Sequence, residues 1–347
     1  MMRKYMYNGK EIKPTVEIYH DLVPYLGGIR EKAFYTDIDK CVDAWRTTQT
    51  AVSDLFGDLL AVRTPSAPPL SYGHLVSLGV PLAMPEDAEP NVKPCVNSIE
   101  EGIEFLEARR DIDFADCDIC RHYIAQNAAL QAAFPEMKIA PLAGYSAQGV
   151  ITTAVLLRGQ DFFLDLYDEP EEVHTFLSLL NDSVISFRKF LHRTNGWAEV
   201  RPRGIGMPDD FASLIPPHMW SEFVIPYWKK YFDELTTGTD RFLHCENTTP
   251  AHLRWLKDAG ITRYQPSVAD ALTIENIREN TDIPFDWLLY AYRITEMADA
   301  EIEAWVDATV EAGITTIRTQ FGKYAWSTGK MDRIFAFYRA FEKYRVE

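Results

Sequence analysis

Basic residues are scarce in this sequence, and they do not cluster. The 347 residues include 35 Lys and Arg against 51 Asp and Glu, which gives a formal net charge of -16. The cations are scattered among acidic residues, so no patch could neutralise a phosphate backbone. The composition therefore argues against nucleic acid as a partner.

Long apolar runs and paired cysteines are missing as well. No uninterrupted apolar run is long enough to cross a bilayer, and the charged stretch MMRKYMYNGKEIKP is not followed by the apolar core of a signal peptide. Five cysteines is an odd number, which favours reduced thiols over a disulfide framework. We expect a cytoplasmic protein without a membrane span.

The second part of the sequence alternates short apolar runs with amphipathic segments. The runs are KIAPLAG, AEVRPRGIG, RFLHCEN, ITRYQPSV, IPFDWLLYAY and ITTIRTQFG. In the amphipathic segment PEEVHTFLSLL, apolar residues recur at the i, i+3, i+4, i+7 spacing of a helix that packs on a flat surface. Repeated strand and helix units predict a parallel sheet with helices outside. Because no Pro/Gly/Ser-rich linker divides the chain, we expect one α/β domain, a (β/α)8 or TIM barrel.

The first part of the sequence is less regular. Helical spacing covers residues 39–55, 99–109 and 116–134, and the one clear strand candidate covers residues 58–62. The proline-rich stretch RTPSAPPLSYGHLVSLGVPLAMP reads as a long ordered loop. We therefore expect a helical extension over residues 1–57 and the barrel over residues 58–347.

A barrel of parallel strands places its catalytic groups at the C-terminal ends of the strands. This rule converts the expected strands into a list of candidate site residues: Asp58, residues 145–148, Asp209 and Asp210, residues 244–247, residues 265–270, residues 290–293 and residues 320–324.

Three segments resemble the uroporphyrinogen decarboxylase superfamily, in the order found there. They are AGYSAQGVITTAVLLRGQDFFLDLYDEPEEVHTFL, MPDDFASLIPPHMWSEFVIPYWKKYFDEL and FLHCENTTPAHLRWLKDAGI. The resemblance implies a barrel and one of two chemistries. One branch decarboxylates uroporphyrinogen without a cofactor. The other binds zinc and moves methyl groups to or from a corrinoid, as in methylcobalamin:coenzyme M methyltransferases and O-demethylase methyltransferases.

The decarboxylase branch fits this sequence poorly. The resemblance of FGDLL to that branch implies that Asp58 is its central aspartate. However, the N-terminal arginine motif is absent, with Arg30 alone near its place, and Val155 stands at the position of the branch's tyrosine. A strongly acidic protein is also a poor host for a highly anionic porphyrinogen.

The methyltransferase branch implies zinc ligands in RFLHCEN, at His244, Cys245 and Glu246. Side chains alternate along a strand, so His244 and Glu246 face one side and Cys245 the other, and the sequence leaves the register open. The last run, RTQFGKYAW, lacks the cysteine that usually completes the site. Asp209 or Asp210 could supply a carboxylate ligand, or the two could act as acid and base.

We therefore expect a Zn²⁺-assisted methyltransferase that passes a methyl group between a small ether or thiol substrate and a separate corrinoid protein. The sequence leaves the oligomeric state open, with a homodimer as one option. Two alternatives stay beside it: a cofactor-free decarboxylase and a non-catalytic ligand-binding barrel. The expected catalytic residues are Asp58, Asp209 and Asp210. The expected substrate-binding residues are Tyr145, Gln148, Asn247, Tyr290, Tyr292, Gln320 and Tyr324.

Overall fold

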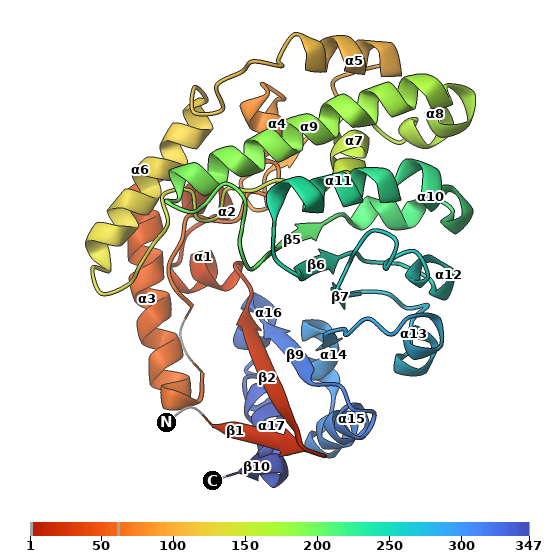
Figure 1. The fold of residues 1–347 in the computed structure, drawn as a ribbon. Helices are drawn as coiled ribbons and strands as arrows, with labels where there is room; N and C mark the ends of the chain where they lie inside the picture. Colours follow the sequence, from red (N-terminus) through yellow and green to blue (C-terminus); the bar gives the residue numbers. More distant parts are fainter. Residues whose placement is uncertain (1–2, 61–62, 347) are drawn as a thin grey trace.

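Strands and helices alternate along the second half of the chain in a computed structural model, which describes residues 3–60 and 63–346 (Figure 1). The strands are β1 (Lys4–Tyr7), β2 (Lys10–Ile18), β3 (Leu82–Ala83), β4 (Asn91–Val92), β5 (Gly204–Pro208), β6 (Asp240–His244), β7 (Arg263–Gln265), β8 (Trp287–Leu289), β9 (Thr316–Phe321) and β10 (Arg345–Val346). The fold is α/β, as expected.

Helices fill most of the remaining chain. They are α1 (Leu22–Leu26), α2 (Glu31–Thr36), α3 (Ile38–Phe56), α4 (Gly73–Ser77), α5 (Ile99–Glu107), α6 (Asp118–Ala133), α7 (Val150–Arg158), α8 (Phe162–Asp168), α9 (Pro170–Thr194), α10 (Trp220–Phe223), α11 (Ile225–Leu235), α12 (Pro250–Leu253), α13 (Ile274–Asn280), α14 (Ala291–Glu296), α15 (Asp299–Glu311), α16 (Lys323–Ser327) and α17 (Asp332–Ala340). None of the helices in the described ranges is long and apolar enough to cross a membrane.

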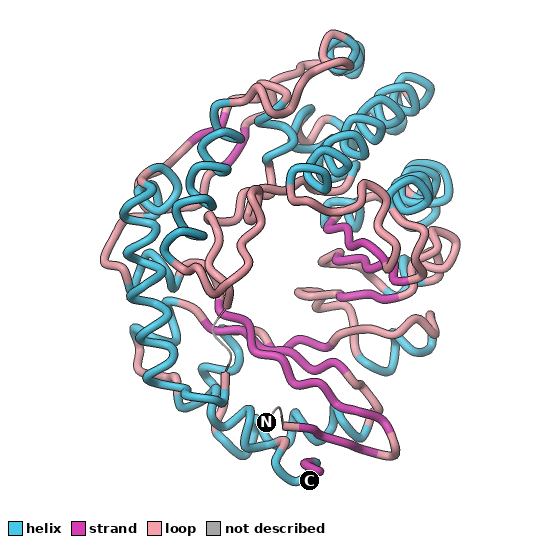
Figure 2. Tube along the Cα trace, turned by 60° about the vertical axis from the view of Figure 1, so that its left-hand side comes forward, coloured by secondary structure: helices cyan, strands magenta, loops and turns pink. Residues whose placement is uncertain are grey.

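The parallel strands form two sheets. β5, β6 and β7 pair in that order, while β2, β9 and β8 pair in a second sheet whose edge carries the antiparallel strands β1 and β10. A single parallel bridge between Tyr264 and Phe285 connects the two, and Leu70 bridges to Tyr145 elsewhere. Figure 2 shows the strands and several loops around a common axis, with most helices outside. Full closure of the expected barrel stays a prediction.

Alternating burial along β9 defines two faces. Ile317, Thr319 and Phe321 are each 0% exposed on the side packed against helices, while Arg318 and Gln320 are only half-buried on the opposite side. We call this opposite side the inner face. Because side chains alternate along a strand, residues two apart share this face.

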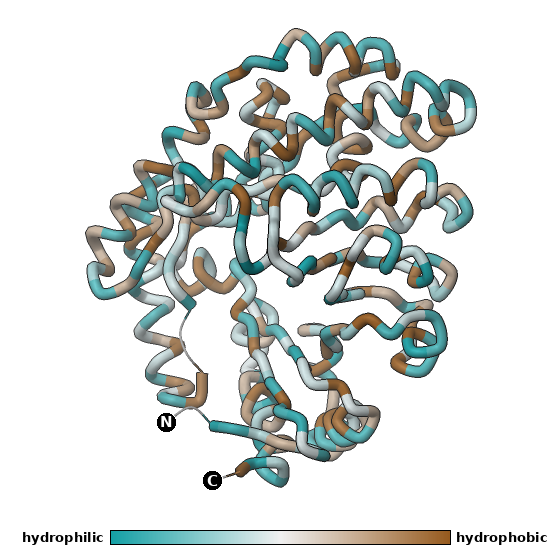
Figure 3. Tube along the Cα trace, viewed as in Figure 1, coloured by the Kyte–Doolittle hydropathy of each residue, from teal (hydrophilic) through white to brown (hydrophobic). Residues whose placement is uncertain are grey.

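Helix α9 confirms the spacing argument. Val173, Phe176, Leu177 and Leu180 are all 0% exposed, and Pro170 occupies the first turn, where its missing N–H costs nothing. Hydrophobic and hydrophilic residues alternate along this helix in Figure 3. The apolar stripe fixes which side of α9 packs inward.

The N-terminal expectations need correction. Residues 1–57 were expected to form a helical extension, but they include β1 and β2, and β2 pairs with β9 over residues 13–18. Of the strand expected at residues 58–62, the first two residues belong instead to a 3-10 helix, Gly57–Leu59, and residues 61–62 lie outside the described residues. Likewise, the run KIAPLAG is not a strand: residues 138–140 are irregular and residues 141–144 form a turn.

Candidate functional site

A charged network occupies the inner face of the sheet that contains β9. The Arg318 guanidinium donates from Nη1 to Oδ2 of Asp286 at 3.0 Å, and from Nη2 to Oε1 of Glu17. Asp286 is 2% exposed. Burial raises the pKa of its carboxyl group, while Arg318 and Arg263 oppose that rise. These two cations therefore already compensate the buried carboxylate of Asp286.

Gln265 of β7 links this network to the end of β6. Its side-chain oxygen accepts from Arg318 Nη1 at 2.8 Å and Nε at 3.3 Å, and its amide nitrogen donates to Nδ1 of His244 at 2.6 Å. Arg318 stands on β9 and reaches β7 across β8, so both side chains must lie on the inner face. Gln265 is 6% exposed, which holds the amide in a fixed environment.

His244 meets two carboxylates at the adjoining ends of β5 and β6. Its Nε2 lies 3.6 Å from Oδ1 of Asp210 and 3.8 Å from Oε1 of Glu246. The backbone N–H of Glu246 donates to Oδ1 of Asp210 at 3.0 Å, which fixes the two acidic residues relative to each other. We call Asp210, His244 and Glu246 the His244 cluster. All three side chains are about a quarter to a third exposed, so solvent and small molecules can reach them.

Cys245 lies outside this cluster. It is 0% exposed, and its thiol donates to the backbone carbonyl of Asp209 with Sγ at 3.2 Å. Burial raises the pKa of the thiol, with further increases from Asp210 and Asp209. The register that sequence left open is thus resolved: His244 and Glu246 share the inner face, and Cys245 cannot join them as a ligand.

Asp209 also points away from the cluster. It is 0% exposed, and it accepts hydrogen bonds from the backbone of Thr152 at 2.7 Å and Ile151 at 3.3 Å, and from Nε1 of Trp228 at 2.7 Å. It therefore caps the N-terminus of α7. Burial raises its pKa to about 6, although these donors oppose the rise. Only glycine fits at residue 149, since a Cβ there would lie 2.4 Å from Cγ of Asp209.

Tyrosines follow the C-terminal ends of β8 and β9. Tyr290 and Tyr292 stack with ring centroids 5.6 Å apart, and Tyr292 is 61% exposed. Tyr324 is 53% exposed and donates to Oε1 of Glu296 at 3.1 Å. Burial raises the pKa of Tyr290, and Glu246 is among the acidic groups that add to the rise, so this ring lies within the electrostatic reach of the His244 cluster.

The other residues expected to bind substrate lie in three kinds of position. Tyr145 is 3% exposed and shares a 2.8 Å hydrogen bond with Ser77, so it belongs to the core. Asn247 is exposed in a left-handed turn with φ of 56°. Gln320 and Gln148 do line cavities.

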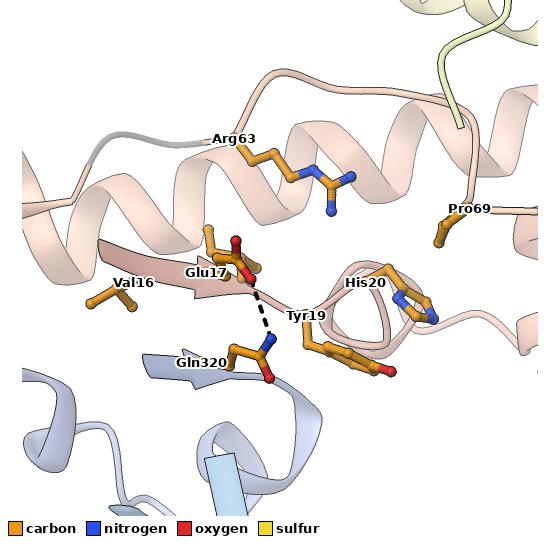
Figure 4. Close-up of a pocket in the computed structure, with 8 residues that line it drawn as sticks. Val16, Glu17, Tyr19, His20, Arg63, Pro69 and Gln320 are labelled. Carbon is orange, nitrogen blue, oxygen red and sulfur yellow. Dashed lines mark hydrogen bonds between the residues drawn. The ribbon is translucent and has the colours of Figure 1, made fainter. Parts of the chain in front are cut away.

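The larger cavity opens between β2 and β9 and has a volume of about 590 Å3 (Figure 4). Its lining residues are Val16, Glu17, Ile18, Tyr19, His20, Arg63, Pro69 and Gln320. A neighbouring cavity of about 270 Å3 shares Tyr19, His20 and Pro69, and reaches Gln148. Gln320 donates to Oε2 of Glu17 at 3.2 Å.

Sequence reasoning missed Glu17, Tyr19, His20 and Arg63 in this cavity. Glu17 lies in β2, and Tyr19 and His20 come directly after this strand. The buried residues of β2, Ile12, Val16 and Ile18, are interrupted by Lys and Pro. The two-residue spacing of Val16 and Ile18, which is typical of a strand, was the signal in the sequence that could have located β2. Asp58 is exposed in its 3-10 helix and is not among the residues that line these two cavities. Its expected central place in a decarboxylase site stays a prediction.

The strand ends thus carry one imidazole and two carboxylates that solvent can reach, with several tyrosines after the neighbouring strands. These residues are not among those that line the two cavities. Such a set can donate and accept hydrogen bonds, move a proton and hold an apolar or aromatic group. In the described part of the chain, no group of three or more His, Cys, Asp or Glu residues is arranged to hold a metal ion. This arrangement defines an α/β protein with an enzyme-like site at the C-terminal ends of parallel strands.

Comparison with known proteins gives the family. The sequence model of the uroporphyrinogen decarboxylase (URO-D) family matches residues 72–276, more than half of the chain. The chain belongs to this family. Among solved structures it is similar to a methyltransferase from Methanosarcina mazei, with a TM-score of 0.67 and 15% sequence identity over 96% of this chain and 94% of that one. No curated protein sequence matches the chain.

Proposed function

We propose that this protein is a methyltransferase of the uroporphyrinogen decarboxylase family. It would pass a methyl group between a small ether or thiol substrate and a corrinoid carried by a separate protein, and its two sheets would belong to one closed (β/α)8 barrel. The observation that carries the proposal is the His244 cluster, which places one imidazole between two carboxylates at the open ends of β5 and β6. The fold shared with a methyltransferase supports the choice.

Decarboxylation is a weaker account of the same residues. A decarboxylase of this family must hold several substrate carboxylates, which calls for unpaired arginines. Arg318 and Arg263 on the inner face already pair with Glu17, Asp286 and Asp240, which leaves Arg63 as the arginine that lines the larger cavity. The His244 cluster adds two more acids, which repel an anionic substrate.

In the proposed reaction, His244 acts on the atom that loses the methyl group. Its Nε2 hydrogen bonds to that oxygen or sulfur and stabilises the negative charge that forms as the bond to carbon breaks. Glu246 and Asp210 accept hydrogen bonds from N–H or O–H groups of the substrate, and they can pass a proton to or from the departing atom. A docked corrinoid supplies the cobalt chemistry that accepts or donates the methyl group.

The residues do not fit the zinc that the family's methyltransferase branch uses. Zinc would supply a Lewis acid and prefers four ligands, with thiolates common among them. Here Cys245 is buried on the opposite side of β6, and the end of β9 carries Gln320 and Phe321 instead of a cysteine. The proposed activation of the departing oxygen or sulfur therefore uses protein groups, while the corrinoid remains the partner in methyl transfer.

A direct assay tests the proposal. Protein is mixed under anaerobic conditions with cob(I)alamin and a panel of O-methyl and S-methyl compounds, and formation of methylcobalamin is followed by absorbance. We expect at least one donor to be demethylated, with the product identified by mass spectrometry. If no donor transfers its methyl group while carboxylic acids release carbon dioxide, the decarboxylase alternative takes its place.

The exposed tyrosine Tyr292 gives a prediction about corrinoid docking. A flat macrocycle would stack on this ring, so we expect Tyr292→Ala to raise KM for the corrinoid about tenfold and leave kcat nearly unchanged. Tyr167→Ala is the matched control, because Tyr167 of α8 is 60% exposed against 61% for Tyr292. Steady-state kinetics with varied corrinoid measures both. Equal KM values for the two variants would contradict docking at Tyr292.

A further inference from the structure

We infer that Arg318 and Gln265 fix the ring proton of His244 on Nε2, so that the His244 cluster is a hydrogen-bond donor site closed to a metal at that nitrogen. The inference deepens the proposed function and rests on it only for what the proton does in the reaction. A series of hydrogen bonds that crosses the inner face from β9 to β6 fixes the tautomer of the His244 ring.

The first link is Arg318, which has only donors to offer. A guanidinium carries N–H groups on all three nitrogens and no acceptor. Glu17 and Asp286 hold Arg318 from two directions, so Nη1 and Nε stay directed toward Gln265 at 2.8 and 3.3 Å. Gln265 must therefore turn its oxygen to Arg318, because the opposite orientation would set NH2 against N–H.

The second link is the amide nitrogen of Gln265. Once the oxygen faces Arg318, the NH2 group faces Nδ1 of His244 at 2.6 Å and donates to it. Nδ1 must then be an acceptor without a hydrogen. The ring proton of neutral His244 consequently lies on Nε2, which faces Asp210 at 3.6 Å and Glu246 at 3.8 Å.

This arrangement is the reverse of a metal-binding histidine. A histidine that binds a metal through one ring nitrogen donates the hydrogen on its other nitrogen to a carboxylate, carbonyl or water. For Nε2 of His244 to bind a metal, Nδ1 would have to carry that hydrogen, and Gln265 would have to turn its NH2 toward Arg318. The positively charged Arg318 thus opposes metal binding at His244 through two successive hydrogen bonds, with Gln265 between them.

The test is a single substitution at Gln265 that reverses the direction of its hydrogen bond with His244. In Gln265→Glu, the carboxylate accepts both from Arg318 and from a hydrogen on Nδ1 of His244, so Nε2 presents its lone pair to the space between Asp210 and Glu246. We expect the affinity for zinc alone, measured by competition with a chromogenic chelator, to rise 10- to 100-fold over wild type. The double variant Gln265→Glu/His244→Ala is expected to lose this gain.

A second measurement reads the tautomer without any substitution at Gln265. Histidine is labelled with 15N, and two-bond 1H–15N correlations are recorded for wild type and for His244→Gln, which identifies the His244 signal among the eight histidines. We expect the pattern of an Nε2–H tautomer. An Nδ1–H pattern in wild type, or unchanged zinc affinity in folded Gln265→Glu protein, would overturn the inference.

These results are independent of the proposed reaction. Neither experiment contains a methyl donor or a corrinoid, so an Nε2–H tautomer combined with no methyl transfer refutes the function and leaves the tautomer intact. Conversely, methyl transfer with an Nδ1–H tautomer refutes only the role of Arg318 and Gln265 as positioning residues.

Discussion

Replacing His244 by glutamine is expected to lower kcat/KM for methyl transfer by about 100- to 1000-fold, since the variant loses the hydrogen that stabilises the departing atom. Glutamine keeps the polarity and much of the volume of the side chain, but its amide cannot present an N–H to Asp210 and Glu246 in the geometry of the ring. Initial rates of methylcobalamin formation measure the loss. Because the cluster is partly exposed, the free energy of unfolding should change little.

His218→Gln is the matched control for this substitution. His218 is exposed in the 3-10 helix Pro217–Met219 and does not belong to the His244 cluster. We expect its kcat/KM to stay within twofold of wild type. Equal rates for wild type and His244→Gln would exclude the His244 cluster as the reacting centre.

Replacing Asp209 by alanine has the largest expected effect on stability. The substitution leaves the backbone N–H groups of Ile151 and Thr152 and Nε1 of Trp228 without their acceptor. Loss of a helix cap and of a buried acceptor together costs about 3 kcal/mol of unfolding free energy. Denaturant-induced unfolding measures this quantity. A loss below about 1 kcal/mol would contradict the capping role.

Asp209 also gives a pH dependence with a defined sign. Burial raises its pKa in the folded protein from 3.8 to about 6, so the folded state binds more protons than the unfolded state between these values. Its contribution to stability is therefore present below about pH 4 and decreases as the pH rises through about 6. The difference in unfolding free energy between wild type and Asp209→Asn should fall across this window and then level off. A difference that grows with pH would contradict the burial of this carboxylate.

The helical and strand framework of the second half could be predicted because its pattern is local. In helix α9 the residues Val173, Phe176, Leu177 and Leu180 stand at regular helical spacing, and each is 0% exposed. Strands β6 and β9 overlap the runs RFLHCEN and ITTIRTQFG. Strand β2 escaped prediction because Lys and Pro interrupt its apolar positions, and its partner β9 lies about 300 residues further along the chain.

The candidate site could be predicted only in part, because contacts across the sheets decide which side chains face inward. The sequence alone does not distinguish the adjacent residues Asp209 and Asp210. In the structure Asp209 caps α7, whereas Asp210 lies next to His244. The same holds for Cys245 beside His244, whose register depends on pairing with β5 and β7. The sequence predicted Gln265 only as part of the strand end at residues 265–270. Its hydrogen bonds to Arg318 could not be predicted, because Arg318 belongs to a strand far along the chain.

The most direct test of the proposed function compares single-turnover methyl transfer in a small set of variants. His244→Gln, Glu246→Gln and Asp210→Asn change the cluster, whereas Cys245→Ala and Asp58→Asn change residues that the structure places outside it. The proposal predicts rates at least about 100-fold below wild type for the first member, reduced rates for the next two, and rates within twofold of wild type for the last two. Full activity in His244→Gln together with an inactive Asp58→Asn would contradict it.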